Sequence, residues 1–177
     1  MRAAVLGLLM FALPGVGFCY SQQAGDTSTS AAGQCCKPGD STPPAELVKQ
    51  VPKGQLKSPY QDFQKIAEEG HKQFMLPGCN ECHGGTGGGG ICPPLTSGVW
   101  FWGGDDDTLF RLITLGTQEL EKEGYKRLAA GTVKAPMPPM ANTIKNSDDL
   151  WKIIAWIRSI NPAGSNPPAS QPSAPKE

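Results

Sequence analysis

A five-residue motif in the middle of the chain has the spacing needed to hold a cofactor covalently. Cys79 and Cys82 are separated by two residues, and His83 follows directly, which gives the pattern C-x-x-C-H. Thiols one helical turn apart can each add to a vinyl group of haem, while the adjacent imidazole presents a nitrogen to the iron. A thioredoxin-like redox pair would need a strand–helix–strand context, and a zinc site would need further ligands at matching spacing. The motif therefore predicts one haem c, bound through Cys79 and Cys82, with His83 as an iron ligand.

The other side of the haem needs a second ligand, and a proline-rich loop offers two methionines. Met137 and Met140 lie in the segment Ala-Pro-Met-Pro-Pro-Met-Ala at residues 135–141. Prolines stiffen such a loop and lower the entropic cost of holding a weak thioether on iron. His71 is a poorer candidate, because it is expected on the polar face of a helix as a solvated surface residue.

Helices are expected to position these residues. Apolar side chains at spacings of three and four predict one helix from residue 59 or 60 to residue 74, and another from the acidic cluster at 105–107 to Gly116. The clearest pattern predicts a helix that Ser147 caps and that ends at Ile160, because its isoleucines form one apolar stripe. No segment shows the period-two alternation of a strand, so the predicted fold class is all-α with long loops.

Composition divides the chain into a folded middle and low-complexity flanks. The 177 residues include 22 Gly and 17 Pro, and 38% hydrophobic residues indicate a modest core. An apolar stretch near the amino terminus has the features of a signal peptide over residues 1–21, with cleavage between Cys19 and Ser21. Residues 22–57 and 161–177 are poor in large apolar side chains. We therefore expect a disordered arm and a disordered tail on either side of a haem domain at 58–160.

Charge and hydropathy limit the partners. The chain has 16 Lys and Arg against 16 Asp and Glu and no long basic run, which argues against nucleic acid as a partner. No later apolar segment is long enough to span a membrane, so we expect a periplasmic protein without a membrane span after signal cleavage. In that oxidising compartment we expect Cys92 to form a disulfide with Cys35 or Cys36.

The order of these features resembles the class I cytochromes c over residues 58–160. A helix, the haem motif, a glycine-rich loop, Pro-x-Leu, a central helix, a Met-Pro loop and a terminal helix follow one another as in that family. The resemblance implies a fold of helices around one covalent haem, in which the carbonyl of Pro93 accepts a hydrogen bond from His83. It also implies that Met137, which is followed by proline, is the second iron ligand rather than Met140.

The stretches between these motifs are similar to a narrower group, the cytochromes cL and their relatives. These proteins accept electrons from methanol dehydrogenases that contain pyrroloquinoline quinone (PQQ) in methylotrophs. The similar segments are 91–96, 99–100, 103–110, 137–139 and 148–158.

This narrower resemblance implies a one-electron carrier and not an enzyme. Such a carrier would take electrons from a PQQ-dependent methanol or alcohol dehydrogenase and pass them to a terminal oxidase or another cytochrome. Two alternatives stay open from the residues alone. One is a haem enzyme or gas sensor with an open sixth coordination site, and the other is a haem module of a membrane oxidase, attached through an uncleaved signal segment.

Overall fold

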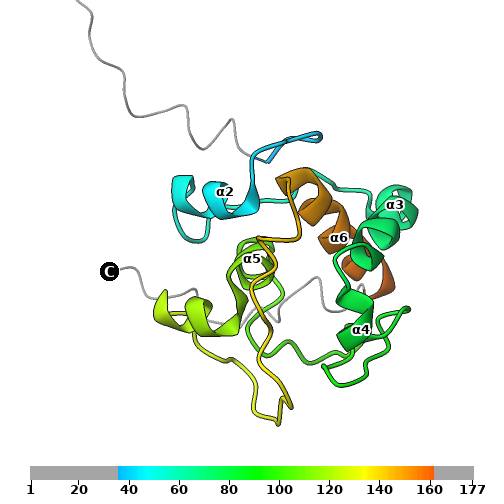
Figure 1. Cartoon of the computed structure of the whole chain (residues 1–177), viewed down its shortest axis with the longest axis vertical. Coiled ribbons are helices and arrows are strands. Elements are labelled where there is room, and N and C mark those ends of the chain that lie inside the picture. Colours follow the sequence, from blue (N-terminus) through cyan, green and yellow to red (C-terminus); the bar gives the residue numbers. More distant parts are fainter. Residues whose placement is uncertain (1–35, 162–177) are drawn as a thin grey trace, which may run out of the picture.

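A computed structural model describes residues 36–161 of the chain, and the regular elements in that range are all helices (Figure 1). They are α2 (Pro44–Gln50), α3 (Phe63–Met75), α4 (Cys79–His83), α5 (Asp106–Lys122) and α6 (Ser147–Ile160). The predicted all-α fold class is confirmed. Within the described range, no helix is both long enough and apolar enough to cross a membrane. The expected signal peptide, residues 22–35 of the arm and residues 162–177 of the tail lie outside the described residues.

Each long helix begins after a side chain that caps its first turn. Asp62 caps α3, which therefore begins later than residue 59 or 60, where the apolar spacing placed it. Asp105 caps α5, as the acidic cluster predicted. Asn146 caps α6 by accepting a hydrogen bond from a backbone N–H of the first turn. Ser147, the expected cap, is instead a buried helical residue whose hydroxyl donates to a backbone carbonyl outside the helix.

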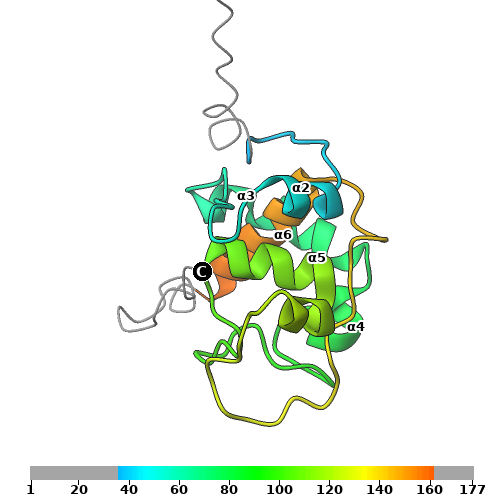
Figure 2. The ribbon, with the colours of Figure 1, turned by 90° about the vertical axis from the view of Figure 1, so that its left-hand side faces the viewer.

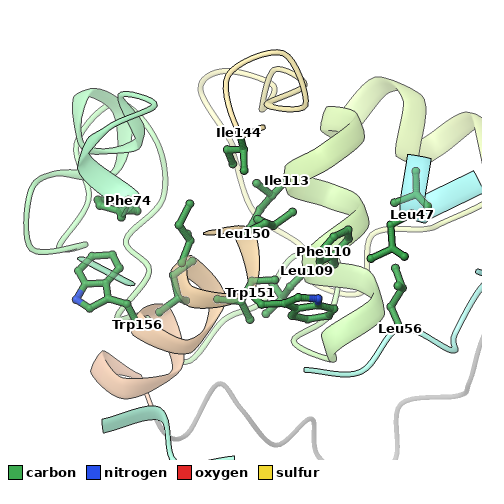
Figure 3. Packing of buried hydrophobic residues seen from close by; sticks show 14 of the residues in the cluster. Leu47, Leu56, Phe74, Leu109, Phe110, Ile113, Ile144, Leu150, Trp151 and Trp156 are labelled. Carbon is green, nitrogen blue, oxygen red and sulfur yellow. The ribbon is translucent and has the colours of Figure 1, made fainter. Parts of the chain in front are cut away.

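Helices α3 and α6 cross in close contact, and Gly70 lies at the crossing. A Cβ atom at Gly70 would overlap the backbone carbonyl of Lys152, so the two helices could not approach as they do with a larger residue there. Next to this point, the rings of Phe74 and Trp156 lie 4.3 Å apart between centroids (Figure 3). The crossing fixes the direction in which α3 leads into the haem motif of α4.

Residues 36–57, which we expected to be a disordered arm, belong to the folded unit. Figure 3 shows side chains from this segment beside α5. The buried apolar residues of the segment are Leu47, Val48, Val51 and Leu56. Arg111, buried in α5, donates to the carbonyl of Val48 at 2.9 Å and to that of Val51 at 2.6 Å. The expectation of disorder was wrong because a few apolar side chains are enough to pack this segment against α5 when a distant arginine also binds its backbone carbonyls.

The folded unit also includes Asn161, the first residue of the expected tail. Asn161 is buried, and its side-chain amide donates to the carbonyls of Leu95 at 2.8 Å and Ser97 at 2.7 Å. The end of α6 is thereby attached to the loop that follows α4. This loop and the long loop between α5 and α6 lie at the same end of the molecule (Figure 2).

Candidate cofactor site

A cavity is lined by the loop that follows α4, by the loop between α5 and α6, and by residues of the neighbouring helices. The empty space in this cavity and the open solvent in front of it together amount to ≈ 970 Å³. Cofactor pockets typically have mostly apolar walls. The walls of this cavity are mainly aliphatic and aromatic, and they include Leu95, Trp100, Leu109, Ile113, Ile153 and Ile157. Such a space suits a large cofactor with an apolar body.

The residues expected to bind haem are mostly found around this cavity. Cys79, His83, Pro93 and Met137 all contribute to its walls. Cys82 is on the same short helix α4 but is not among the lining residues. Met140 is not in the walls either; it packs against the apolar core. The two methionines that the sequence left as alternatives therefore differ in position, and only Met137 faces the cavity.

His83 is oriented by a backbone carbonyl. Its Nδ1 atom lies 2.9 Å from the carbonyl oxygen of Pro93, the atom pair that the resemblance implied. Burial lowers the pKa of the His83 imidazole, while the hydrogen bond to Pro93 opposes this shift. A neutral ring that donates from Nδ1 keeps the lone pair of Nε2 available for a metal. His83 is thus prepared to act as an iron ligand.

Backbone hydrogen bonds fold the glycine-rich loop back onto α4. The N–H of Gly89 donates to the carbonyl of His83 at 2.8 Å, and the N–H of Cys92 donates to that of Cys82 at 3.1 Å. These bonds bring Pro93 beside the imidazole, although it is ten residues away in the chain.

His71 has a different role from the solvated surface residue that we expected. Its Nε2 atom lies 2.7 Å from the carbonyl oxygen of Gly85 in the glycine-rich loop. Its ring stacks on that of Trp156 with centroids 4.8 Å apart. The helical pattern placed His71 on a polar face beside Lys72; that face stays exposed at Lys72, but the loop and α6 contact the His71 ring and leave it half-buried. His71 therefore connects α3 to the loop after the haem motif.

The thiols in this region are not arranged as predicted. Cys92 is a buried free thiol, so the expected disulfide to Cys36 is wrong, and the alternative partner Cys35 lies outside the described residues. The side chain of Cys92 contacts that of Cys82. Burial raises the pKa of Cys79 to about 11, and burial together with the contact to Cys82 raises the pKa of Cys92 to about 11. Burial therefore favours the neutral form of both thiols.

The loop that carries Met137 rests on a break in α5. Gly116, where we expected the helix to end, has φ 73° and ψ 169°, and the helix resumes after it and continues to Lys122. The N–H of Thr117 donates to the carbonyl of Met137 at 3.0 Å. Thr117 was not among the residues predicted from the sequence, although the glycine inside an amphipathic helical pattern was an available signal for this site.

Trp100 tests whether the cavity suits haem in particular. Its indole N–H is buried and has no hydrogen-bond partner among the described residues, although the side chain lines the cavity. Leaving a buried donor unpaired costs about 1–3 kcal/mol. The propionate groups of haem are carboxylates that accept such a bond. Trp151 has a similar unpaired N–H, but it lies outside the cavity walls. Apolar walls, thiols at the motif spacing, an oriented imidazole and this donor together fit haem.

Comparisons with known proteins give a family match and one distant relative. The family model described as Cytochrome c matches residues 67–161, more than half of the chain. The chain is also similar to the Cbb3-type cytochrome c oxidase subunit CcoP of Azospirillum brasilense, with 29% identity over 112 residues. The matched region is 62% of this chain and 36% of the relative, so the chain spans about a third of that protein's length. No solved structure gives a significant match.

Proposed function

The chain belongs to the cytochrome c family, and from this we propose that it is a one-electron carrier with a single haem c. Cys79 and Cys82 would hold the haem covalently, and His83 and Met137 would be its axial ligands. The observation that carries the proposal is the placement of Cys79, His83 and Met137 around one apolar cavity. When bound, haem supplies a reversible one-electron change at its iron.

Residues of the chain would tune the reduction potential of the haem iron in two ways. The carbonyl of Pro93 holds the His83 ring and fixes its tautomer, which sets the strength of the iron–nitrogen bond. The apolar walls exclude water, and this disfavours the more highly charged oxidised state, so the reduction potential is raised. A carrier with both axial positions occupied is favoured over a haem enzyme or gas sensor, because Met137 lines the cavity.

The charges on the two long loops that contribute to the cavity walls support docking to an acidic partner. The loop segments 82–104 and 124–146 contain no acidic residue. Their exposed basic side chains are Lys126, Arg127, Lys134 and Lys145. Two apolar side chains on the same loops, Val99 and Leu128, are 50% and 44% exposed. Exposed apolar and basic side chains on the same two loops suit a transient complex that forms quickly and dissociates quickly.

We propose that the electron donor is a PQQ-dependent methanol or alcohol dehydrogenase in the periplasm, on the basis of the resemblance to the cytochromes cL. An oxidase or a further cytochrome would be the acceptor. The similarity to a cytochrome c oxidase subunit supports an oxidase as the acceptor. It also favours a second candidate function, in which the chain is a haem module within an oxidase assembly rather than a diffusing carrier.

The optical spectrum of the oxidised holoprotein tests the proposed carrier. We expect the weak near-infrared band of Met-to-iron ligation in the wild type and in Met140→Ala, and its loss in Met137→Ala. A wild type that lacks the band and binds exogenous ligands freely would contradict the carrier function. Rapid-mixing reduction by a PQQ dehydrogenase, compared with co-purification with an oxidase, separates the two candidate functions.

A further inference from the structure

We propose that Gly116 and Thr117 are positioning residues that hold Met137 at its place in the cavity wall, where it serves as the axial ligand. The inference rests on the proposed function, because it takes Met137 as the ligand. Three features of the structure carry it: the break in α5, the fit of the methionine loop against that break, and the hydrogen bonds between them.

The break in α5 frees backbone groups that a continuous helix would use internally. In an uninterrupted α-helix, the N–H of residue 117 would donate to the carbonyl of residue 113. Because Gly116 leaves helical geometry, with φ 73° and ψ 169°, that bond does not form. A donor at Thr117 and an acceptor at Ile113 are then available inside the protein, where unpaired backbone groups are costly.

The methionine loop satisfies both of these groups. The N–H of Thr117 donates to the carbonyl of Met137 at 3.0 Å, and the N–H of Met140 donates to the carbonyl of Ile113 at 3.0 Å. The hydroxyl of Thr117 lies 3.4 Å from the same Met137 oxygen and adds a weaker bond. The loop is therefore fixed on both sides of the Met-Pro-Pro-Met segment by groups that the break exposes.

The fit at Gly116 leaves no room for a side chain. A Cβ atom there would lie 2.7 Å from the carbonyl oxygen of Met137 and 2.7 Å from the backbone nitrogen of Pro139. Both neighbours are backbone atoms, so the loop itself would have to move. The positive φ at Gly116 is a second reason for glycine at this position. Backbone conformation and contact thus both couple residue 116 to the position of Met137.

A thioether is a weak ligand for iron, so its retention depends on how well the protein holds it in place. Imidazole added to ferric holoprotein competes with the methionine for the iron. Its apparent dissociation constant therefore measures how firmly the methionine is held. We expect Gly116→Ala to bind imidazole at least tenfold more tightly than the wild type, with a weaker near-infrared band and a lower reduction potential. The matched control is Gly54→Ala, since Gly54 has φ 81° but nothing within 4 Å of an added Cβ. It should keep the wild-type imidazole affinity.

Thr117→Val provides a second test if Gly116→Ala fails to fold. It removes the hydroxyl bond but keeps the backbone bond to Met137, so we expect imidazole affinity to rise only about threefold. Thr117→Ser should restore the wild-type value. The matched control is Thr143→Val, because the Thr143 hydroxyl donates to the carbonyl of Met140 at 2.9 Å in the same loop. This control should leave the band and the affinity unchanged.

The outcomes separate this inference from the proposed function. If Met137→Ala loses the band but folded Gly116→Ala binds imidazole as the wild type does, the positioning role is wrong and the carrier stands. If Gly116→Ala does not fold, wild-type affinity in Thr117→Val overturns the positioning role instead. If the band persists in Met137→Ala, the ligand assignment fails and the inference fails with it. If imidazole affinity rises in Thr143→Val but in neither Gly116→Ala nor Thr117→Val, the positioning role of Gly116 and Thr117 is wrong, and the bond that holds Met140 takes its place.

Discussion

Replacing Arg111 by methionine should detach the segment around α2 from the rest of the core. Arg111 is buried, and its guanidinium donates to the carbonyls of Val48 and Val51 and to the carboxylate of Asp107 at 3.0 Å. Methionine fills a similar volume but supplies no donor. The substitution would leave two buried carbonyls unsatisfied and a buried carboxylate without its cationic partner.

The size of this effect follows from what remains bound to Asp107. Removing one partner of a buried ion pair typically costs 3–5 kcal/mol, and we expect a value near the lower end, about 3 kcal/mol. The reason is that Asp107 still accepts hydrogen bonds from the N–H of Leu56 and the hydroxyl of Tyr125. For a unit of this size, such a loss corresponds to a fall in Tm of roughly 10 °C.

Denaturant unfolding of the holoprotein measures the loss in free energy of unfolding. Limited trypsin digestion shows which segment of the chain becomes accessible. Digestion of Arg111→Met should cut first at Lys49 and Lys53, which lie within the detached segment. The matched control is Arg127→Met, because Arg127 is exposed and its stacking on Phe101 should contribute about 1 kcal/mol or less. A loss below about 1 kcal/mol in Arg111→Met, or wild-type resistance at Lys49 and Lys53, would refute the reasoning.

Three other predictions concern the helix crossing, the acid stability and the docking surface. Gly70→Ala should destabilise the protein by about 1–3 kcal/mol, because its Cβ overlaps the α6 backbone; thermal unfolding of the holoprotein measures this. Burial raises the pKa of Asp148, but hydrogen bonds from Tyr60 and Lys152 outweigh it and leave the pKa below its usual value. The stability from this carboxylate is present above its unfolded pKa and is lost as pH falls through the lower folded pKa, so unfolding curves of Asp148→Asn should lack this part of the acid dependence. Lys134→Glu should slow electron transfer with an acidic partner at low ionic strength, and the difference from the wild type should vanish at high salt in stopped-flow measurements.

Several features of this protein could be read from the sequence because they depend on neighbours in the chain. The haem motif at 79–83 is a matter of spacing within one helical turn. The apolar stripe of α6 and the acidic cap of α5 are also local patterns. Helix α6 spans the predicted residues, and α5 begins where predicted, although it continues past Gly116 to Lys122. The absence of period-two alternation was enough to predict the all-α fold class, since strands need that alternation to bury one face.

Other features depended on contacts between residues far apart in the chain. The segment around α2 seemed too poor in apolar residues to pack, because its anchor, Arg111, lies about sixty residues away. His71 was predicted to be solvated, because only the folded chain brings a loop and α6 against its ring. Cys92 seemed free to pair with the N-terminal cysteines, but the return of the loop onto α4 places it against Cys82.

The two methionines at the site also show the difference between what local sequence predicts and what tertiary contacts decide. Met137 and Met140 share one proline-rich loop, and the resemblance to class I cytochromes c, not local geometry, singled out Met137. Both methionines pack against the apolar core, but of the two only Met137 is also in the cavity wall. This difference arises where the loop meets the broken turn of α5 at Gly116, because the freed backbone groups bind the loop in one register. Local sequence predicts the candidate ligands, whereas the packing of one helix against a distant loop decides which of them faces the cavity.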